Sequence, residues 1–371
     1  MSALRQTAMR VRRWLDEAAW PLWIARGIDH EGLFYEQLDF AGTPDLAACR
    51  RVRVQGRQLF CFARALAAGH EAARAPLARA LEAVEARCWS PDGKPGWIQT
   101  LTPDGQPLDT RRDTYDHAFM LFGLAAASQV GFPHAGVLAE RTVAFLDDFV
   151  ADPKAGGYFE GLPATMPRRS NPHMHLMESM LALFEGTGAQ HWLDRANAIA
   201  ALFERRFFDH ARGTLGEYFT RDLVLAEGAS GDSVEPGHHF EWTWLLHRLA
   251  EAGGHDYRAQ AAALYGFGLR HGIGADGFAV DECNRAGRIL RASRRTWPQT
   301  ELIKAYLAQG DYDDAARVAD MVLASYLATR VPGLWIDQFS ANGEARSDVV
   351  PASTLYHLVV AFEDLLRLAP A

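Results

Sequence analysis

Asp113-Thr-Tyr-Asp-His-Ala-Phe-Met-Leu-Phe-Gly-Leu-Ala-Ala-Ala127 is the stretch that decides the fold class of this chain. Its bulky residues Phe119, Leu121, Phe122 and Leu124 form a broad apolar stripe at helical spacing. An aspartate or threonine precedes the stripe and is suited to cap the first helical turn. Similar stripes recur along the chain, so we expect a mainly helical protein.

The same periodicity predicts twelve helices and no convincing central strand. The predicted ranges are 5–25, 51–69, 71–89, 114–129, 135–150, 173–186, 190–207, 239–252, 256–271, 297–309, 312–328 and 352–367.

A segment that starts with glycine and contains aromatic residues lies between every second pair of predicted helices. These segments are 32–38, 96–101, 157–161, 213–219, 277–282 and 333–339, and each is expected to form a short hairpin or extended loop. Their leading glycines are 64, 61, 56, 64 and 56 residues apart, about the length of two helices with their connections.

Six helix pairs therefore account for the chain, and two arrangements of them are possible. An open solenoid usually carries a tighter consensus at fixed offsets, whereas here only the loop and the helical pattern recur. We therefore predict an all-α (α/α)6 barrel of six inner and six outer helices, forming one catalytic domain over residues 1–371. Such a barrel would bring one end of every inner helix to a single central cavity.

Composition narrows the function classes. The chain has 371 residues, 49% of them hydrophobic, a mean hydropathy of -0.15 and a formal net charge of -8. No basic stripe is available for a phosphate backbone and no run approaches the roughly 18 apolar residues of a membrane span, so neither nucleic acid nor membrane is an expected partner.

The cysteines and the N-terminal segment suggest a cytoplasmic protein. Cys49, Cys61, Cys88 and Cys283 stand singly, so we expect reduced thiols rather than a disulfide framework. The basic N-terminal segment is interrupted by acidic residues before any apolar core forms, which does not fit a secretory leader.

Three histidine-rich stretches, 171–175, 235–242 and 353–357, point to acid/base chemistry. His238 and Glu241 lie three apart near the start of a predicted helix and share a face, although a plain capping arrangement would explain them too. His175 and His357, taken singly, are more often structural than functional. Arg57 lies on a helix predicted to be an inner one, so burial would require it to have a partner or a ligand.

Other chemistries find little support in the sequence. His173 and His175 are two apart and point in different directions from a helix, and no HExxH motif or Cys/His set accompanies them, so no metal site is expected. No nucleotide fingerprint occurs in a strand-turn-helix setting, and no GxSxG elbow is present, so no cofactor is expected either.

Six ordered stretches resemble the successive motifs of the N-acylglucosamine 2-epimerase family, over about residues 14–365. They are Arg53-Val-Gln-Gly-Arg57, Asp113-Thr-Tyr-Asp116-His-Ala-Phe, Asn171-Pro-His-Met-His175-Leu-Met-Glu178, Glu235-Pro-Gly-His238-His-Phe-Glu241-Trp, Trp297-Pro-Gln-Thr-Glu301 and Ser353-Thr-Leu-Tyr-His357. The family has an (α/α)6 barrel and includes mannose isomerases, sulfoquinovose isomerase and cellobiose 2-epimerases.

The resemblance implies metal-free proton transfer at C2 of an open-chain aldose through a cis-enediol(ate). It implies that His238 and His357 are the acid/base pair and that Arg57 is the cation near the O1 and O2 oxygens. Substrate-binding roles are expected for Asn171, His175, Glu241, Tyr115, Asp116 and Trp297, with Trp97 and Trp335 joining the aromatic floor. Removal of a weakly acidic C2 proton needs both a base and a positive group at the developing oxyanion, and this set supplies them.

Within the family, the chain looks most like the D-mannose isomerase branch, which interconverts D-mannose and D-fructose or a close analogue such as D-lyxose. Arg53, and Trp297-Pro298 in place of a double tryptophan, depart from the pattern in ways that affect the sugar pocket. The alternatives are a 2-epimerase of N-acylglucosamine or cellobiose type, a sulfoquinovose-type isomerase and, more remotely, a sugar-binding protein or a glycoside hydrolase using Glu241 with Asp116 or Glu178. The expected partner is a monosaccharide, and the expected state is a monomer or homodimer.

Overall fold

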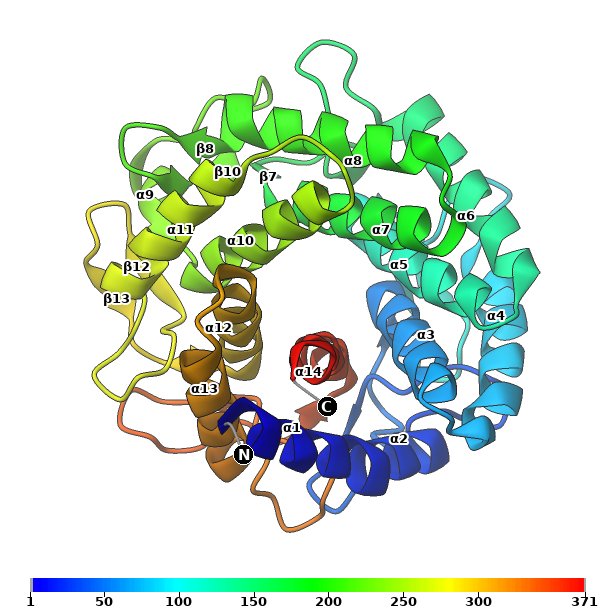
Figure 1. The fold of residues 1–371 in the computed structure, drawn as a ribbon. Coiled ribbons are helices and arrows are strands. Elements are labelled where there is room, and N and C mark those ends of the chain that lie inside the picture. The colour runs from blue at the N-terminus through cyan, green and yellow to red at the C-terminus, as the bar shows by residue number, and fades with distance from the viewer. Residues whose placement is uncertain (1–2, 370–371) are drawn as a thin grey trace.

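The apolar stripes pack as two concentric rings of helices in a computed structural model, which describes residues 3–369 (Figure 1). The inner ring consists of α3 (Val52–Ala67), α5 (Thr114–Gln129), α7 (Asn171–Thr187), α10 (Pro236–Glu251), α12 (Thr296–Gln309) and α14 (Leu355–Leu368). The outer ring consists of α1 (Ala3–Trp14) with α2 (Trp20–Arg26), α4 (Arg74–Cys88), α6 (Pro133–Phe145), α8 (Gln190–Leu202), α11 (Arg258–His271) and α13 (Tyr312–Ser325).

Helix contacts close the inner ring. Each inner helix packs against the next, from α3 through to α14, and α14 returns to pack against α3. The first outer helix, α1, contacts both α13 and α14, so the two ends of the chain meet (Figure 1). The predicted (α/α)6 barrel is thus confirmed.

The predicted helices are all present, with differences at their ends. Helices α7 and α10 begin two and three residues earlier than predicted, because Pro172 and Pro236 are accommodated in their first turns. The predicted helix 5–25 is interrupted by a π-helical turn over Leu15–Ala19, just before Pro21 near the start of α2. A short helix that we did not predict, α9 (Gly228–Asp232), precedes α10.

The glycine and aromatic segments form very short strands that join neighbouring repeats. The antiparallel groups are β1 (Gln37–Leu38) with β16 (Val350–Pro351); β2 (Arg50–Arg51), β3 (Thr100–Leu101) and β4 (Pro107–Asp109); β5 (Arg112–Asp113) with β6 (Gly161–Leu162); β7 (Arg168–Arg169) with β10 (Tyr218–Phe219); β8 (Phe208–Asp209) with β9 (Thr214–Leu215); β11 (Ser233–Val234), β12 (Glu282–Asn284) and β13 (Ile289–Arg291); and β14 (Arg294–Arg295) with β15 (Gln338–Phe339). The strand before each inner helix pairs with a loop strand of another repeat, and the β1–β16 pair completes the circle.

Five buried side chains, which we call the clamp residues, fasten these loops to the inner helices. They are Gln55, His117, His173, His239 and Gln299, and each accepts the backbone N–H of a loop residue, at Phe34 (2.9 Å), Trp97 (3.0 Å), Tyr158 (3.0 Å), Leu215 (3.1 Å) and Ala279 (2.8 Å) respectively. Each satisfies a loop donor that would otherwise be buried without a partner.

The clamp histidines accept through Nε2, so they must be neutral. Burial lowers the pKa of His117 and of His173 to about 4, and that of His239 to about 3. His173 and His239 thus have a structural role, since each holds a loop against an inner helix.

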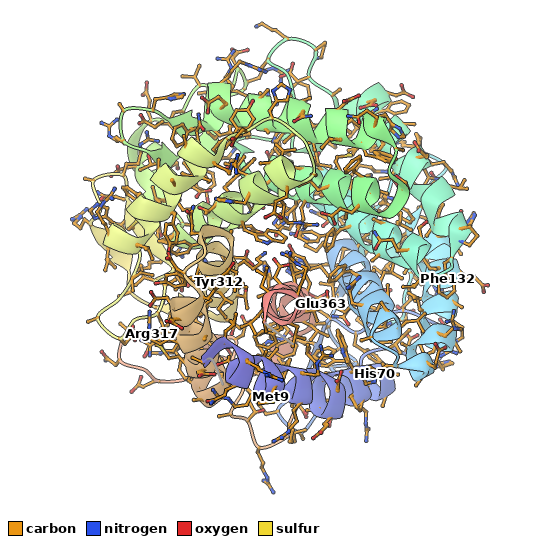
Figure 2. All side chains as sticks on the ribbon, viewed as in Figure 1. Met9, His70, Phe132, Tyr312, Arg317 and Glu363 are labelled. Carbon is orange, nitrogen blue, oxygen red and sulfur yellow. The ribbon has the colours of Figure 1, made fainter. Side chains whose placement is uncertain are left out.

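Side chains fill most of the space inside the inner ring, as the stick view shows (Figure 2). All four cysteines are free thiols, as expected. Across residues 3–369, no helix combines the length and the apolar character needed to cross a membrane.

Candidate active site

Each inner helix contributes a buried side chain to the centre of the barrel, and in the five helices that carry a clamp residue this side chain stands two positions after it. These axis residues are Arg57, Phe119, His175, Glu241, Glu301 and His357. Four of them, Arg57, His175, Glu241 and His357, line a cavity of about 280 Å³, together with Tyr115, Asn171, Glu235, His238, Arg295, Trp297, Asp337, Ser353 and Thr354. This volume lies just below the range of about 300–1,000 Å³ typical of drug-sized ligands, which suits a molecule of monosaccharide size.

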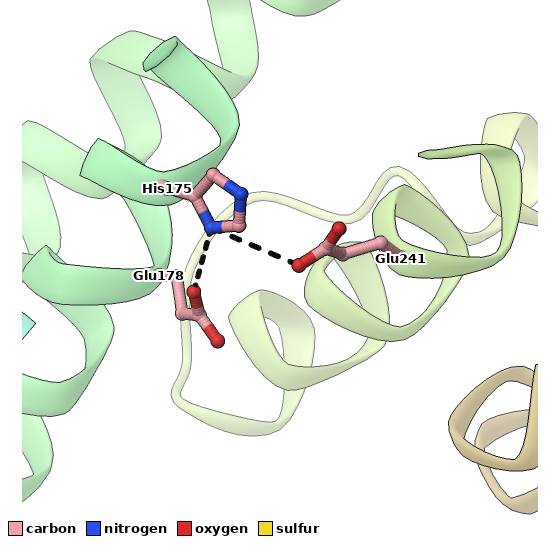
Figure 3. Close-up of side chains that lie close together, drawn as sticks. All are labelled: His175, Glu178 and Glu241. Atoms are coloured by element: carbon pink, nitrogen blue, oxygen red, sulfur yellow. Dashed lines mark hydrogen bonds and ion pairs between the residues drawn. The ribbon is translucent and has the colours of Figure 1, made fainter. Parts of the chain in front are cut away.

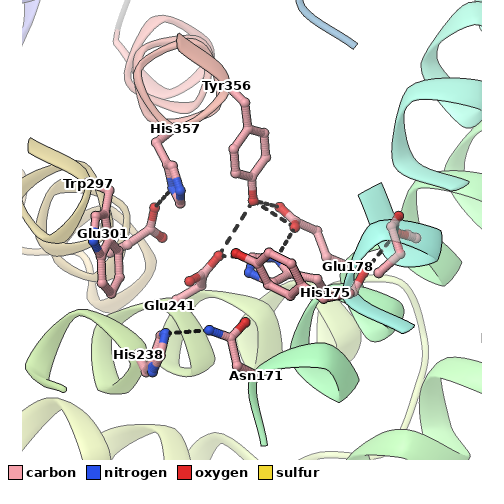
Figure 4. Close-up of polar contacts among 12 residues, drawn as sticks. Asn171, His175, Glu178, His238, Glu241, Trp297, Glu301, Tyr356 and His357 are labelled. Carbon is pink, nitrogen blue, oxygen red and sulfur yellow. Dashed lines mark hydrogen bonds and ion pairs between the residues drawn. The ribbon is translucent and has the colours of Figure 1, made fainter. Parts of the chain in front are cut away.

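His357 presents a neutral imidazole to this cavity. Its Nδ1 lies 2.8 Å from Oε1 of the fully buried Glu301, a geometry suited to an Nδ1–H that donates to an ionised carboxylate (Figure 4). Burial, reinforced by the positive charges of Arg57 and Lys304, lowers the pKa of His357 well below its ordinary value. Nε2 is therefore a lone-pair nitrogen available to a ligand.

His238 has the opposite electrostatic environment. Its Nδ1 lies 2.9 Å from Oε2 of the buried Glu217. Burial alone would lower the pKa of His238, but the carboxylates of Glu217 and Glu235 outweigh it and raise that pKa to about 9. His238 is thus an imidazolium at neutral pH.

Asn171 can form a hydrogen bond with His238 in either charge state of the imidazole. Its side-chain amide lies 3.0 Å from His238 Nε2, with Nδ2 as the closer atom, and its Oδ1 is buried without a hydrogen-bond partner (Figure 4). Rotation of the amide would let Oδ1 accept the Nε2–H of the imidazolium, whereas Nδ2 donates to the neutral ring.

His175 belongs to a hydrogen-bonded group deeper in the barrel. Its Nδ1 lies 3.0 Å from Oε2 of Glu178 and 3.7 Å from Oε1 of Glu241 (Figure 3). The hydroxyl of Tyr356 donates to Glu178 at 2.7 Å. Burial lowers the pKa of His175 to about 4, so this ring is neutral at pH 7.

Glu241 is surrounded by other carboxylates. Burial first, and then the negative charges of Glu301 and Glu178, raise the pKa of Glu241 well above its ordinary value. This favours a protonated carboxyl, which can donate a hydrogen bond as well as accept one.

Arg57 brings a positive charge to the cavity wall. Its guanidinium donates to the Tyr115 hydroxyl at 2.8 Å and to the Ser353 carbonyl oxygen at 3.2 Å, and it lies 3.9 Å from the centre of the Phe119 ring. Both hydrogen-bond partners are neutral, so they do not cancel its charge. The N-termini of the inner helices also lie at this cavity, and their helix dipoles add positive potential to it.

Trp297 lies between the two histidines. Its ring centre is 5.2 Å from that of His238 and 5.7 Å from that of His357. Gly237 makes this position possible, because a Cβ there would come within 2.4 Å of the Trp297 ring. Trp297 thus forms the wall that separates and supports both imidazoles.

Three residues expected in the pocket lie elsewhere. Asp116 is fully buried, 2.6 Å from Arg53 in an ion pair, and is not among the cavity-lining residues. Trp97 donates to Thr142 of α6, and Trp335 stacks on Trp23 of α2 with ring centres 5.1 Å apart. Both tryptophans face the outer helices, so the prediction that they floor the pocket is wrong.

We did not predict the carboxylates that hold the two histidines. Glu301 stands in the Trp297-Pro-Gln-Thr-Glu motif but received no role, and Glu217 was noted only as part of a loop. Glu235, Arg295 and Asp337 also line the cavity without having been predicted.

Two groups of side chains are close enough to share a metal ion. They are His175, Glu178 and Glu241, and Glu241, Glu301 and His357. The ammonium of Lys304 lies 2.5 Å from Oε2 of Glu301, so a positive charge already compensates the second group.

A larger cavity of about 550 Å³ lies at the opposite end of the barrel, near the C-termini of the inner helices. Its charged groups pair with one another, as in Arg64 with Glu363 at 2.8 Å and Arg248 with Glu185. No histidine is among the residues that line this cavity.

Comparisons with known proteins place this closed barrel with its polar cavity in the class of sugar-isomerising enzymes. The family model described as N-acylglucosamine 2-epimerase matches residues 32–361, so the chain belongs to that family. A Rhizobium meliloti protein named mannose-6-phosphate isomerase is 35% identical over 376 residues, which cover 95% of each chain.

Two further proteins show the range of the family. A D-mannose isomerase from Thermobifida fusca is 28% identical over 352 residues, covering 87% of this chain and 86% of that one. The structure of cellobiose 2-epimerase from Bacillus thermoamylovorans has a TM-score of 0.86 at 18% identity, covering 97% of this chain and 99% of that one.

Proposed function

We propose that this enzyme interconverts D-mannose and D-fructose by moving a proton between C2 and C1 of the open-chain sugar, through a cis-enediol(ate) and without a metal. The observation that carries the proposal is a pair of histidines on one small cavity, each with its Nδ1 within 2.9 Å of a buried glutamate. His357 is held neutral by burial and nearby cations, and His238 is held cationic by carboxylates. A general base and a general acid are thus present together at neutral pH.

His357 is the proposed base. Nε2 removes the C2 proton of the aldose and returns it to C1, which converts aldose to ketose. The imidazolium formed in between is stabilised by the Glu301 carboxylate at Nδ1.

His238 is the proposed acid. As the pyranose opens, its Nε2–H can protonate the ring oxygen O5 while His357 Nε2 takes the proton of the O1 hydroxyl, and both histidines regain their starting states by proton exchange with water. His238 can then move a proton from O2 to O1, which the conversion of aldose to ketose requires. The Asn171 amide fits this role because it can offer either Nδ2 as a donor or Oδ1 as an acceptor to His238 Nε2 as the charge of His238 changes.

Arg57 is the proposed stabiliser of the enediolate. A guanidinium with neutral partners keeps its charge available for the oxygens at C1 and C2, where negative charge develops. The helix N-termini around the cavity act in the same direction.

A free hexose is the proposed substrate rather than its 6-phosphate, although the Rhizobium meliloti relative is named for mannose 6-phosphate. The second cavity arginine, Arg295, lies 2.9 Å from Glu235 and 3.2 Å from Asp281. A phosphate would have to compete with these two carboxylates for the guanidinium of Arg295.

The test is to assay EDTA-treated protein for fructose with D-mannose as substrate, and in parallel for fructose 6-phosphate with mannose 6-phosphate. We expect fructose from mannose at a rate that EDTA does not change. Loss of activity on EDTA treatment that added metal restores would contradict the metal-free mechanism, and a preference for the phosphorylated sugar would contradict the substrate.

A 2-epimerase is the second candidate, because the cellobiose 2-epimerase structure shares the whole barrel. The product separates the two reactions. An epimerase returns the proton to the other face of C2 and forms glucose from mannose, whereas the proposed isomerase forms fructose.

A further inference from the structure

Lys304 is a buried charge that the proposed mechanism does not use. Lysine is rare in this chain, since only Lys94, Lys154 and Lys304 are found among the 38 basic residues. Lys304 has no exposed surface, and its Nζ lies 3.8 Å from the centre of the Trp244 ring. Burying an ammonium is costly unless it is closely paired, so its position calls for an explanation.

Lys304, Glu301 and His357 form a chain that leads to the cavity. Glu301 divides its two oxygens between its neighbours, with Oε2 lying 2.5 Å from Lys304 Nζ and Oε1 lying 2.8 Å from His357 Nδ1. Two further buried glutamates, Glu178 and Glu241, also raise the pKa of Lys304 through their negative charges.

We infer that Lys304 is a positioning residue, whose ammonium keeps Glu301 ionised so that the ring proton of His357 stays on Nδ1 and Nε2 remains free for the sugar. An ionised carboxylate can only accept a hydrogen bond, which requires a proton on Nδ1. A protonated carboxyl could donate to Nδ1 instead, and the ring proton would move to Nε2. The inference rests on the proposed function, because Lys304 is assigned a role that it performs through His357, the proposed base.

The electrostatics of Glu301 support this role. Burial raises the pKa of Glu301, and the charge of Lys304 is the largest influence that opposes the rise. Without Lys304, Glu301 would lie near the buried carboxyl groups of Glu178 and Glu241 with no ammonium to compensate its negative charge. This favours protonation of Glu301.

The test replaces Lys304 by methionine, which is similar in length and uncharged. The imidazole tautomers are read by NMR in protein labelled with 15N-histidine, and the His357 signals are identified by their loss in His357→Gln. We expect the proton on Nδ1 in the natural protein and on Nε2 in Lys304→Met. We also expect kcat for mannose to fall at least about 100-fold, the lower end of what acid/base catalysis contributes, with KM changed less than about threefold.

Lys154→Met is the matched control, since it removes an exposed lysine that lies 3.2 Å from Asp222. It should leave both the tautomer and kcat unchanged. A folded Lys304→Met protein that keeps the proton on Nδ1, or keeps kcat within about threefold of the natural enzyme, would overturn the inference.

A second pair of variants covers the case in which Lys304→Met does not fold. Glu301→Gln and Glu301→Gln/Lys304→Met are compared, and their kcat values should agree within about threefold because Lys304 acts through Glu301. A larger further loss in the double variant overturns the inference. If the natural protein converts no hexose, the proposed function fails, while the His357 tautomer in the resting protein still decides the role of Lys304.

Discussion

On α7 and on α10, a clamp histidine lies close in sequence to a histidine that lines the cavity, and the two have different hydrogen-bond partners. His173 and His175 are two residues apart on α7, and His239 directly follows His238 on α10. The clamp histidines accept backbone N–H groups and are neutral, whereas His238 and His357 are each held by a glutamate and face a cavity. The role of a histidine here follows from the partner of its Nδ1 and Nε2, and burial alone does not distinguish the two sets.

The largest expected effect comes from exchanging these histidines for glutamine. His238→Gln or His357→Gln should lower kcat by about 10²–10⁴-fold, because each removes one member of the acid/base pair. His239→Gln is the matched control, since Gln55 and Gln299 already perform the clamp role in other repeats, and it should stay within about threefold of the natural enzyme. Equal losses in all three variants would remove the distinction between the two sets.

A smaller effect is expected from Glu217→Gln, which weakens the cationic state of His238. A general acid works only while protonated, so activity should fall as pH rises through about 9 in the natural enzyme. Loss of the Glu217 charge lowers the pKa of His238, so this alkaline limb should move to lower pH, with about a tenfold loss of kcat at pH 8 for a pKa near 7.

Glu160→Gln serves as the control for that pH profile. Glu160 occupies the corresponding loop position in another repeat and pairs with Arg169 at 2.6 Å, away from both site histidines. Its alkaline limb should match that of the natural enzyme. A Glu217→Gln profile that coincides with it would contradict the role of Glu217.

The smallest effect on catalysis is expected from His173→Gln, which should change stability instead. The folded pKa of His173 is about 4, below its ordinary value near 6.5, so between these values the unfolded chain binds more protons. Its contribution to stability is complete above about pH 6.5 and is lost as pH falls toward 4. The natural protein should therefore lose about 2 kcal/mol more than His173→Gln in the free energy of unfolding between pH 7 and pH 5.

Denaturant unfolding at the two pH values measures this difference. His134→Gln is the control, because the His134 side chain is 63% exposed and its removal should leave the pH dependence unchanged. The same pH slope in His173→Gln and the natural protein would show that His173 is not held neutral by the fold.

The helices and the convergence of the motifs could be predicted because both depend on local periodicity and order along the chain. Twelve apolar stripes and six glycine-led loops are enough to favour a closed barrel, and closure brings the first turns of the inner helices together. The direction of an aromatic side chain in a two-residue strand has no such signature, which is why Trp97 and Trp335 were misplaced.

The partners of the site histidines were hidden for a different reason. Glu217 falls in a loop series that includes Glu36, Glu160, Asp281 and Asp337, and like Glu160 and Asp281 it accepts a backbone N–H just before the next inner helix. The repeat therefore predicts its structural contact. Its second contact, with His238 Nδ1, depends on a side-chain direction that only the three-dimensional structure supplies.

The spacing of clamp and axis residues has a consequence for how this barrel can change. Joining the loops depends on the clamp position, whereas neighbouring positions of the same helices line the cavity: Arg57, His175 and Glu241 two residues further along, and His238 one residue before. Reaction chemistry and ring closure can therefore be varied independently. A library randomised at residues 57, 119, 175, 241, 301 and 357 should contain many more folded barrels than one randomised at 55, 117, 173, 239 and 299, so the axis positions are the natural starting point for redesigning what the cavity does.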